Sequence, residues 1–119
     1  MAMPSTSHTV QEHFDKSSAA VAATSARILE AAGKLGSFHE EAKKTSIHLV
    51  RKTAFAGIAT RKAALILTLK SNTDLPSERI AKREQASANR WHLEVRLETP
   101  DQVDRELVSW LKKAYELAA

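Results

Sequence analysis

Side chains of several chemical kinds are concentrated between residues 84 and 92. They supply a carboxylate, two amides, a hydroxyl, a guanidinium and an imidazole, from Glu84, Gln85, Ser87, Asn89, Arg90 and His92. Polar residues that a rigid scaffold holds in a loop are often ligand contacts, so this 84–92 cluster is the best candidate for a specific polar site. The structural alternative is that Ser87 and Asn89 shape a turn while Glu84 pairs with a nearby arginine.

Other groups that could do chemistry are poorly arranged for it. His8 and His13 lie near the start of the chain and have no cysteine thiolate with which to share a zinc ion. Ser46 and His48 would share a strand face, but no acidic residue close in sequence could orient His48 as a catalytic base. The three glycines match no phosphate-binding loop. We therefore expect no catalytic residues, no cofactor and no metal ion.

Basic residues recur beside the turns that the strand pattern predicts. Ten are candidates for contacts with nucleic acid or another polyanion: Lys43, Lys44, Arg51, Lys52, Arg61, Lys62, Arg79, Lys82, Arg83 and Arg90. In a meander, residues 51, 52, 70 and 90 would meet at one sheet end, joined by 79, 82 and 83, and residues 43, 44, 61 and 62 would meet at the other. Phosphate contacts of this kind give affinity without reading sequence. The alternative is that these residues protect hairpins and sheet edges from aggregation.

The net charge of +4 is unevenly distributed along the chain. Residues 42–96 hold twelve Lys and Arg residues against four Asp and Glu, whereas residues 1–41 and 97–119 each hold three against five. The positive charge therefore lies on the expected strands and their loops, which is a hint about partners and not about fold.

The composition is that of an ordinary globular chain of one domain. Of the 119 residues, 43% are hydrophobic and 27% charged, and none is a cysteine. No apolar run approaches the roughly 20 residues of a membrane span, and the first residues lack the pattern of a secretory signal. We expect a cytoplasmic protein without membrane contact, with residues 1–8 disordered and residues 9–119 forming a single domain.

Four strands are expected. Residues 90–98 alternate apolar and polar side chains without a break, with one face formed by Trp91, Leu93, Val95 and Leu97. Earlier strands are expected at 45–50, 54–59 and 64–69, with connections short enough for hairpins. Residues 71–88 are expected to form a polar loop that could include a short helix at 77–84.

Two helices are expected, one before and one after the strands in the sequence. A capping box at residues 9–12 predicts a helical turn, after which Ser17 or Ser18 caps a helix to about residue 32. The last helix is expected to begin at residue 99. Thr99 has a hydroxyl that can serve as the N-cap, Pro100 suits the first helical position, and Gln102 would complete a capping box three residues after the cap. Its buried stripe would be Val103, Leu107, Trp110, Leu111 and Ala114, with Tyr115 just outside it.

Several ordered segments resemble a known family. They are TVQEHF at 9–14, KTSIHL at 44–49, FAG at 55–57, EQASANRWH at 84–92 and VDREL at 103–107, followed by Trp110, Leu111, Ala114 and Tyr115. Over about residues 8 to 117 the chain resembles the bacterial family of domains of unknown function numbered 5655, DUF5655. That family has no assigned catalytic residues, so the resemblance implies none here. More distantly, the strand at 90–92 and the last helix are similar to the YjbR type, which implies a frataxin-like α/β fold and a suggested DNA-binding role.

We expect an α+β fold in which an antiparallel meander of about four strands carries the N-terminal and C-terminal helices on one face. The favoured function is a small non-catalytic binding module that engages nucleic acid or another polyanion. One alternative is a structural or oligomerising domain, possibly a homodimer through the exposed edge of the fourth strand. A second alternative is a small-ligand or enzymatic domain that uses the 84–92 cluster.

Overall fold

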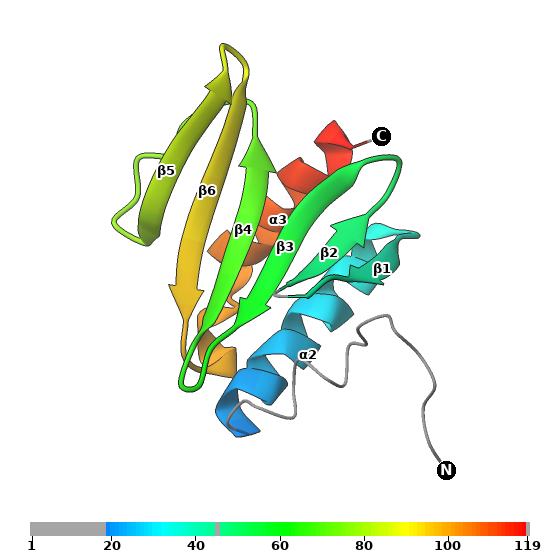
Figure 1. The fold of residues 1–119 in the computed structure, drawn as a ribbon, viewed down its shortest axis with the longest axis vertical. Coiled ribbons are helices and arrows are strands. Elements are labelled where there is room, and N and C mark those ends of the chain that lie inside the picture. Colours follow the sequence, from blue (N-terminus) through cyan, green and yellow to red (C-terminus); the bar gives the residue numbers. More distant parts are fainter. Residues whose placement is uncertain (1–18, 45, 119) are drawn as a thin grey trace.

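The computed structural model describes residues 19–44 and 46–118, which form two helices and one antiparallel sheet (Figure 1). The elements are α2 (Ala19–Leu35), β1 (His39–Ala42), β2 (Ile47–Val50), β3 (Ala54–Thr60), β4 (Leu65–Ser71), β5 (Ile80–Ser87), β6 (Arg90–Leu97), the 3₁₀ turn η1 (Pro100–Gln102) and α3 (Arg105–Leu117). The α+β class is confirmed. Several predictions lie outside the described residues: the disorder expected for residues 1–8, the capping box at 9–12, both candidate caps at 17 and 18, and the first residue of the strand expected at 45–50.

The sheet has six strands in the order β1-β2-β3-β4-β6-β5, all antiparallel to their neighbours. The four expected strands correspond to β2, β3, β4 and β6, which lie side by side in the expected order, and β1 pairs with β2 on the outer side. After β4 the chain forms β5, which is the edge strand. It then returns as β6, which fills the space between β4 and β5. The prediction that the 90–98 strand has an exposed edge is therefore wrong, because β5 pairs with β6 along that side.

Two strands were absent from the sequence prediction. β5 occupies most of the segment that was expected to be a polar loop with a short helix at 77–84, and β1 has only four residues. In β5 only Ile80 is buried, and the other seven residues are exposed. Alternation of apolar and polar residues arises only when one face of a strand is buried, so a strand held by main-chain pairing alone leaves no such pattern.

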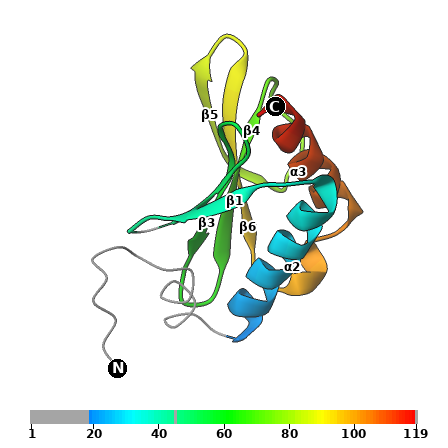
Figure 2. The same cartoon turned by 90° about the vertical axis from the view of Figure 1, so that its right-hand side faces the viewer.

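Both helices pack on the same face of the sheet (Figure 2). The expected α3 stripe is confirmed, since Leu107, Trp110, Leu111 and Ala114 are buried together with the inward side chains of β2, β3, β4 and β6. No described helix or strand covers the opposite face, which we call the open face. Side chains at alternate strand positions, including His48, Thr68 and His92, are only partly buried there.

The last helix begins later than the sequence predicted. Thr99, Pro100 and Gln102 form η1, in which the Gln102 Oε1 accepts a hydrogen bond from the Thr99 N–H at 3.2 Å. The chain then leaves helical geometry at Val103, and Asp104 becomes the N-cap of α3 by accepting the Leu107 N–H at 3.0 Å. The capping signal at 99–102 was therefore that of a separate turn.

Tyr115 is buried and joins three parts of the fold. Its hydroxyl donates to the Ser37 carbonyl at 2.9 Å, and its ring packs edge-on against Phe55 at 5.3 Å. The Arg51 guanidinium lies 4.2 Å above the ring and donates to the Tyr115 carbonyl at 3.1 Å. These contacts connect α3 to the α2–β1 connection and to the β2–β3 turn.

Replacement by alanine should change the free energy of unfolding in opposite directions at Gly33 and Gly36. Gly36 has a φ of +149°, and a Cβ there would collide with the Tyr115 hydroxyl, whose ring is held by Phe55 and Arg51. Gly33 lies in α2 with no atom within 4 Å of an added Cβ. Gly36→Ala should lower the free energy of unfolding by about 1–3 kcal/mol. Gly33→Ala should raise it by about 0.5–1 kcal/mol, because alanine is the better helix former.

Urea denaturation followed by circular dichroism measures both variants under the same conditions. Equal shifts of the two unfolding midpoints in one direction would contradict this account of Gly36.

Candidate functional site

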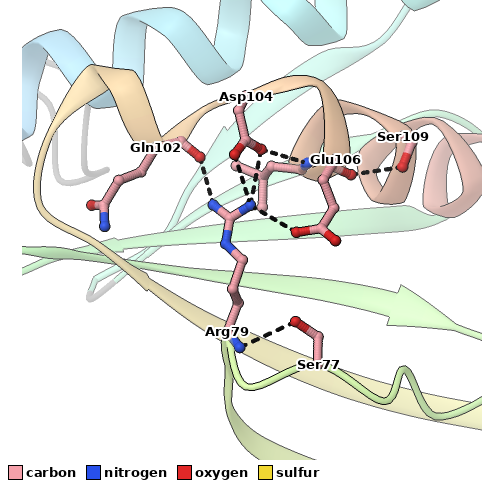
Figure 3. A network of polar contacts seen from close by, with 7 residues as sticks. Ser77, Arg79, Gln102, Asp104, Glu106 and Ser109 are labelled. Atoms are coloured by element: carbon pink, nitrogen blue, oxygen red, sulfur yellow. Dashed lines mark hydrogen bonds and ion pairs between the residues drawn. The ribbon is translucent and has the colours of Figure 1, made fainter.

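Arg79, one of the ten candidate cations, is partly buried, and both Nη atoms of its guanidinium contact groups of the protein itself (Figure 3). Its Nη1 contacts Asp104 Oδ1 at 2.9 Å and Glu106 Oε1 at 3.1 Å, and its Nη2 donates to the Gln102 carbonyl at 2.7 Å. The guanidinium also lies 5.6 Å from the centre of the Trp110 ring. Arg79 therefore fastens the start of β5 to the first turn of α3, and it is not available to a phosphate.

The charges in this network stabilise each other. The Leu107 N–H and then the Arg79 side chain hold the pKa of Asp104 below its ordinary value. Burial alone would lower the pKa of Arg79, but its hydrogen bonds to Asp104 and Glu106 outweigh burial and raise it. The pair is thus fully ionised around neutral pH.

Other candidate cations also have partners. Arg83 Nε contacts Asp74 Oδ1 at 2.7 Å, while its Nη2 donates to the carbonyls of Leu75 and Ser77. Arg51 is held by Tyr115, and Lys43 Nζ lies 3.3 Å from Glu41 Oε1. Arg79, Arg83 and Arg51 therefore have structural roles that the sequence did not reveal.

The remaining candidates lie on the sheet with no ion pair to another described residue. The β2–β3 turn, the end of β4 and the start of β6 lie at one end of the sheet, the upper end in Figure 1, and hold Lys52, Lys70 and Arg90. The β1–β2 and β3–β4 connections are at the opposite, lower end and hold Lys44, Arg61 and Lys62. Lys82 stands beside Glu94 in the middle of the β5–β6 pair. The structure differs from the expectation that residues 79, 82 and 83 join the upper end, because β5 begins opposite Val95, in the lower half of β6.

Two depressions lie next to these cations. The first, which we call the face hollow, is a cavity of about 290 Å³ on the open face, lined by Ser46, His48, Ala54, Ala56, Gly57, Ala59, Thr68, Lys70 and His92. The second, the upper-end pocket, is a cavity of about 60 Å³ lined by Thr53, Ala54, Lys70, Ser71, Asn89, Arg90, Ala114, Leu117 and Ala118. The upper-end pocket is bounded by the end of α3 and the face hollow lies on the opposite side of the sheet, so the two meet only at the upper ends of β3 and β4, where Ala54 and Lys70 line both. Neither lining contains an Asp or Glu side chain.

The structure does not bring the 84–92 cluster together in one pocket. The cluster lies on the β5–β6 hairpin, where alternate side chains point to opposite faces. His92 lines the face hollow and contacts Glu84 at 3.6 Å, whereas Asn89 and Arg90 line the upper-end pocket. Glu84, Gln85 and Ser87 line neither depression. Lys70 was expected at this end of the sheet, but its place in the face hollow was not predicted, and the contribution of Thr68 was missed. The small residues Ala54, Ala56, Gly57 and Ala59 of β3 could have indicated a depression.

His48 has an unusual electrostatic environment. Its pKa is lowered by partial burial and by the positive charge of Lys43, while Glu41 opposes this shift and Lys70 adds to it. Glu41 stands opposite His48 in the β1–β2 pair, but its carboxylate contacts His39 and Lys43, and these hydrogen bonds lower the pKa of Glu41. His48 is therefore a neutral imidazole at pH 7, beside positive charge.

Within residues 19–44 and 46–118, no group of three His, Asp or Glu side chains is placed to hold a metal ion. In the same part of the chain, neither helix has the length and apolar character needed to cross a bilayer.

Replacing Asp104 with asparagine removes the negative charge that faces Arg79, so its effect on stability measures the contribution of that charge. Asparagine can still cap α3, so Asp104→Asn should lower the free energy of unfolding at pH 7 by about 0.5–1 kcal/mol, a value limited by solvent exposure. Because the pKa of Asp104 is lowered by folding, this stability is present above the unfolded-state pKa and is lost as pH falls through the folded-state pKa. The difference in stability between the wild type and Asp104→Asn should therefore begin to shrink below pH of about 4 and should vanish only below the folded-state pKa of Asp104. Glu116→Gln, on the exposed side of α3, is the control, and a gap that stays constant with pH would contradict the assignment.

The pKa of His48 should respond to its neighbours with opposite signs. In an NMR titration, His48 should titrate below the ordinary histidine value of 6.5. Lys70→Gln should raise the pKa by removing a positive charge, whereas Glu41→Gln should lower it further. Shifts of the same sign in both variants would show that these charges do not act on His48.

Comparisons with known proteins identify a family but no activity. The family described as Domain of unknown function (DUF5655) matches residues 10–118, nearly the whole chain. No curated protein and no solved structure matches the chain. Because this match covers nearly the whole chain, the chain belongs to the family of domains of unknown function called DUF5655.

Proposed function

We propose that this domain is a non-catalytic binding module that holds the phosphate groups of nucleic acid at the ends and the open face of its sheet. Lys52, Lys70 and Arg90 make the phosphate contacts at the upper end, and Asn89 and His92 add polar contacts. Arg61, Lys62 and Lys44 provide a second set at the lower end. Arg51, Arg79 and Arg83 are excluded from the contact set, because internal acids, carbonyls or an aromatic ring occupy them.

One observation carries the proposal: Lys70 and Arg90 line one pocket that has no acidic lining residue and make no ion pair with the rest of the described chain. Like charges held near each other raise the free energy of the folded protein, and a bound anion relieves that repulsion. Lysines that protect an edge are expected along the edge strand, where Lys82 lies, whereas Lys70 and Arg90 belong to the inner strands β4 and β6. Here the edge strand β5 is interrupted by two irregularities in its pairing with β6, near residues 81 and 86, which already protect it.

A homodimer through a sheet edge receives less support. The edge of β6 is occupied by β5, so a partner would have to pair with β5 or with the four-residue β1. The pairing irregularities of β5 disfavour a continuous ladder with a second copy. The absence of any acid bonded to His48 among the described residues likewise supports binding over Ser46-based catalysis.

Salt-dependent binding tests the proposal. Fluorescence anisotropy with labelled single-stranded and duplex DNA should detect binding at 25–50 mM salt, and the dissociation constant should rise to the order of 10⁻⁴ to 10⁻⁶ M at physiological salt. The triple variant Lys52→Gln, Lys70→Gln, Arg90→Gln should bind more weakly and should reduce the slope of log K against log salt by about 2 for single strands. The reason is that three phosphate contacts no longer release counterions.

The matched control carries Arg27→Gln, Arg105→Gln and Lys112→Gln, which remove the same charge from exposed positions of α2 and α3. It should retain most of the affinity and nearly all of the slope. No binding of either DNA at low salt, or equal losses in both triple variants, would overturn the proposal.

A further inference from the structure

We propose that the face hollow and the upper-end pocket form one cleft for a phosphate monoester that carries a planar ring, such as a mononucleotide or a terminal nucleotide of a strand. The phosphate lies at Lys70 and Arg90, and the ring lies on the open face over Gly57. This inference rests on the proposed function and adds to it a ligand class and a defined orientation.

The upper-end pocket has the chemistry of a phosphate site. Its polar lining combines two cations, Lys70 and Arg90, with the Asn89 amide and the Thr53 hydroxyl. A water molecule needs roughly 10–15 Å³ of such space, so about 60 Å³ admits a group of a few heavy atoms and excludes a ring. Arginine and lysine are the residues by which proteins bind phosphate oxygens.

The face hollow has the size and lining for a ring. Its volume of about 290 Å³ is close to the roughly 300 Å³ at which small-molecule sites begin. Small residues form its floor, while the His48 imidazole and the Thr68 side chain rise on either side of Gly57. Imidazoles can stack on bases, and the neutral His48 can also donate or accept a hydrogen bond.

Gly57 is explained by neither backbone geometry nor packing. A Cβ at this position would lie 3.8 Å from His48 Cδ2 and 3.9 Å from Thr68 Cβ, which are ordinary contacts. Its φ is not positive, and the irregularity in the β2–β3 pairing lies at Leu49 and Val50, away from it. A glycine inside a strand costs stability and often marks close approach of a ligand.

Lys70 connects the two halves of the cleft. It lines both depressions and lies opposite His92 in the β4–β6 pair. Three acidic groups lie near the cleft on this face: Glu84 contacts His92, Glu41 contacts Lys43, and Glu94 stands between Thr68 and Lys82 in the strand pairing, outside both linings. A phosphate monoester with its ring on the open face and its phosphate in the upper-end pocket would therefore contact Lys70 where the two depressions meet.

Isothermal titration calorimetry at low salt with adenosine monophosphate, adenosine and inorganic phosphate tests the cleft. Adenosine monophosphate should bind about tenfold or more tightly than either fragment, because only it occupies both halves. Gly57→Val should weaken its binding about tenfold by filling the hollow, and Gly57→Ala should have a smaller effect. Ile66→Val, a change on the same face outside both linings, is the matched control, and thermal unfolding verifies that each variant is folded.

The DNA-binding and calorimetry experiments together distinguish failure of the cleft from failure of the proposed nucleic-acid function. If single-stranded DNA binds, but phosphate binds as tightly as adenosine monophosphate or Gly57→Val changes nothing, the cleft is overturned and the phosphate-binding module stands. If adenosine monophosphate binds with the expected variant pattern and DNA does not, the cleft stands as a small-ligand site and the nucleic-acid function falls. If neither binds, both are overturned.

Discussion

The width that two helices can cover governs this fold. A helix with its side chains is about 10 Å across, so two packed side by side cover about 20 Å. Neighbouring strands are about 4.8 Å apart, so this width corresponds to roughly four strands. The sheet has six, and α2 and α3 lie over its middle (Figure 2). The outer strands β1 and β5 must therefore be held by main-chain hydrogen bonds and by side-chain anchors such as Arg79.

The same limit decides what could be predicted from the sequence. Four strands, β2, β3, β4 and β6, contribute several inward side chains each to the core, and their apolar residues mark them in the sequence. β5 buries only Ile80 and no residue of β1 is fully buried, so burial imposes no period on these two strands, and propensity alone could not identify them. The strand order near β5 was unpredictable for the same reason, because an unrecognised strand cannot be placed in a sheet. The class and the helix stripe of α3 were predictable, because both depend on burial.

The candidate site was predictable in composition but not in geometry. The sequence identified the basic residues, yet it could not show that Arg51, Arg79 and Arg83 serve the fold while Arg61, Arg90 and the lysines at the sheet ends do not. The difference lies in which acids, carbonyls and rings the fold brings to each cation. A guanidinium presents a planar set of donors that can satisfy carboxylates and carbonyls together, as Arg79 and Arg83 do, whereas an ammonium group remains more strongly hydrated. The adjacency of the two depressions at Lys70 depends on strand register, which side-chain types do not reveal.

The contacts of Tyr115 have a consequence for the order of folding events. The bonds from Arg51 to the Tyr115 carbonyl and from the Tyr115 hydroxyl to Ser37 span 64 and 78 residues, so they close some of the longest loops in the chain. Closing long loops costs entropy and slows folding. Since Ala114, Leu117 and Ala118 form one wall of the upper-end pocket, a partly folded intermediate with a paired sheet and an undocked α3 would lack that wall. Such an intermediate would resemble the native protein in strand content and yet have no enclosed place for an anion.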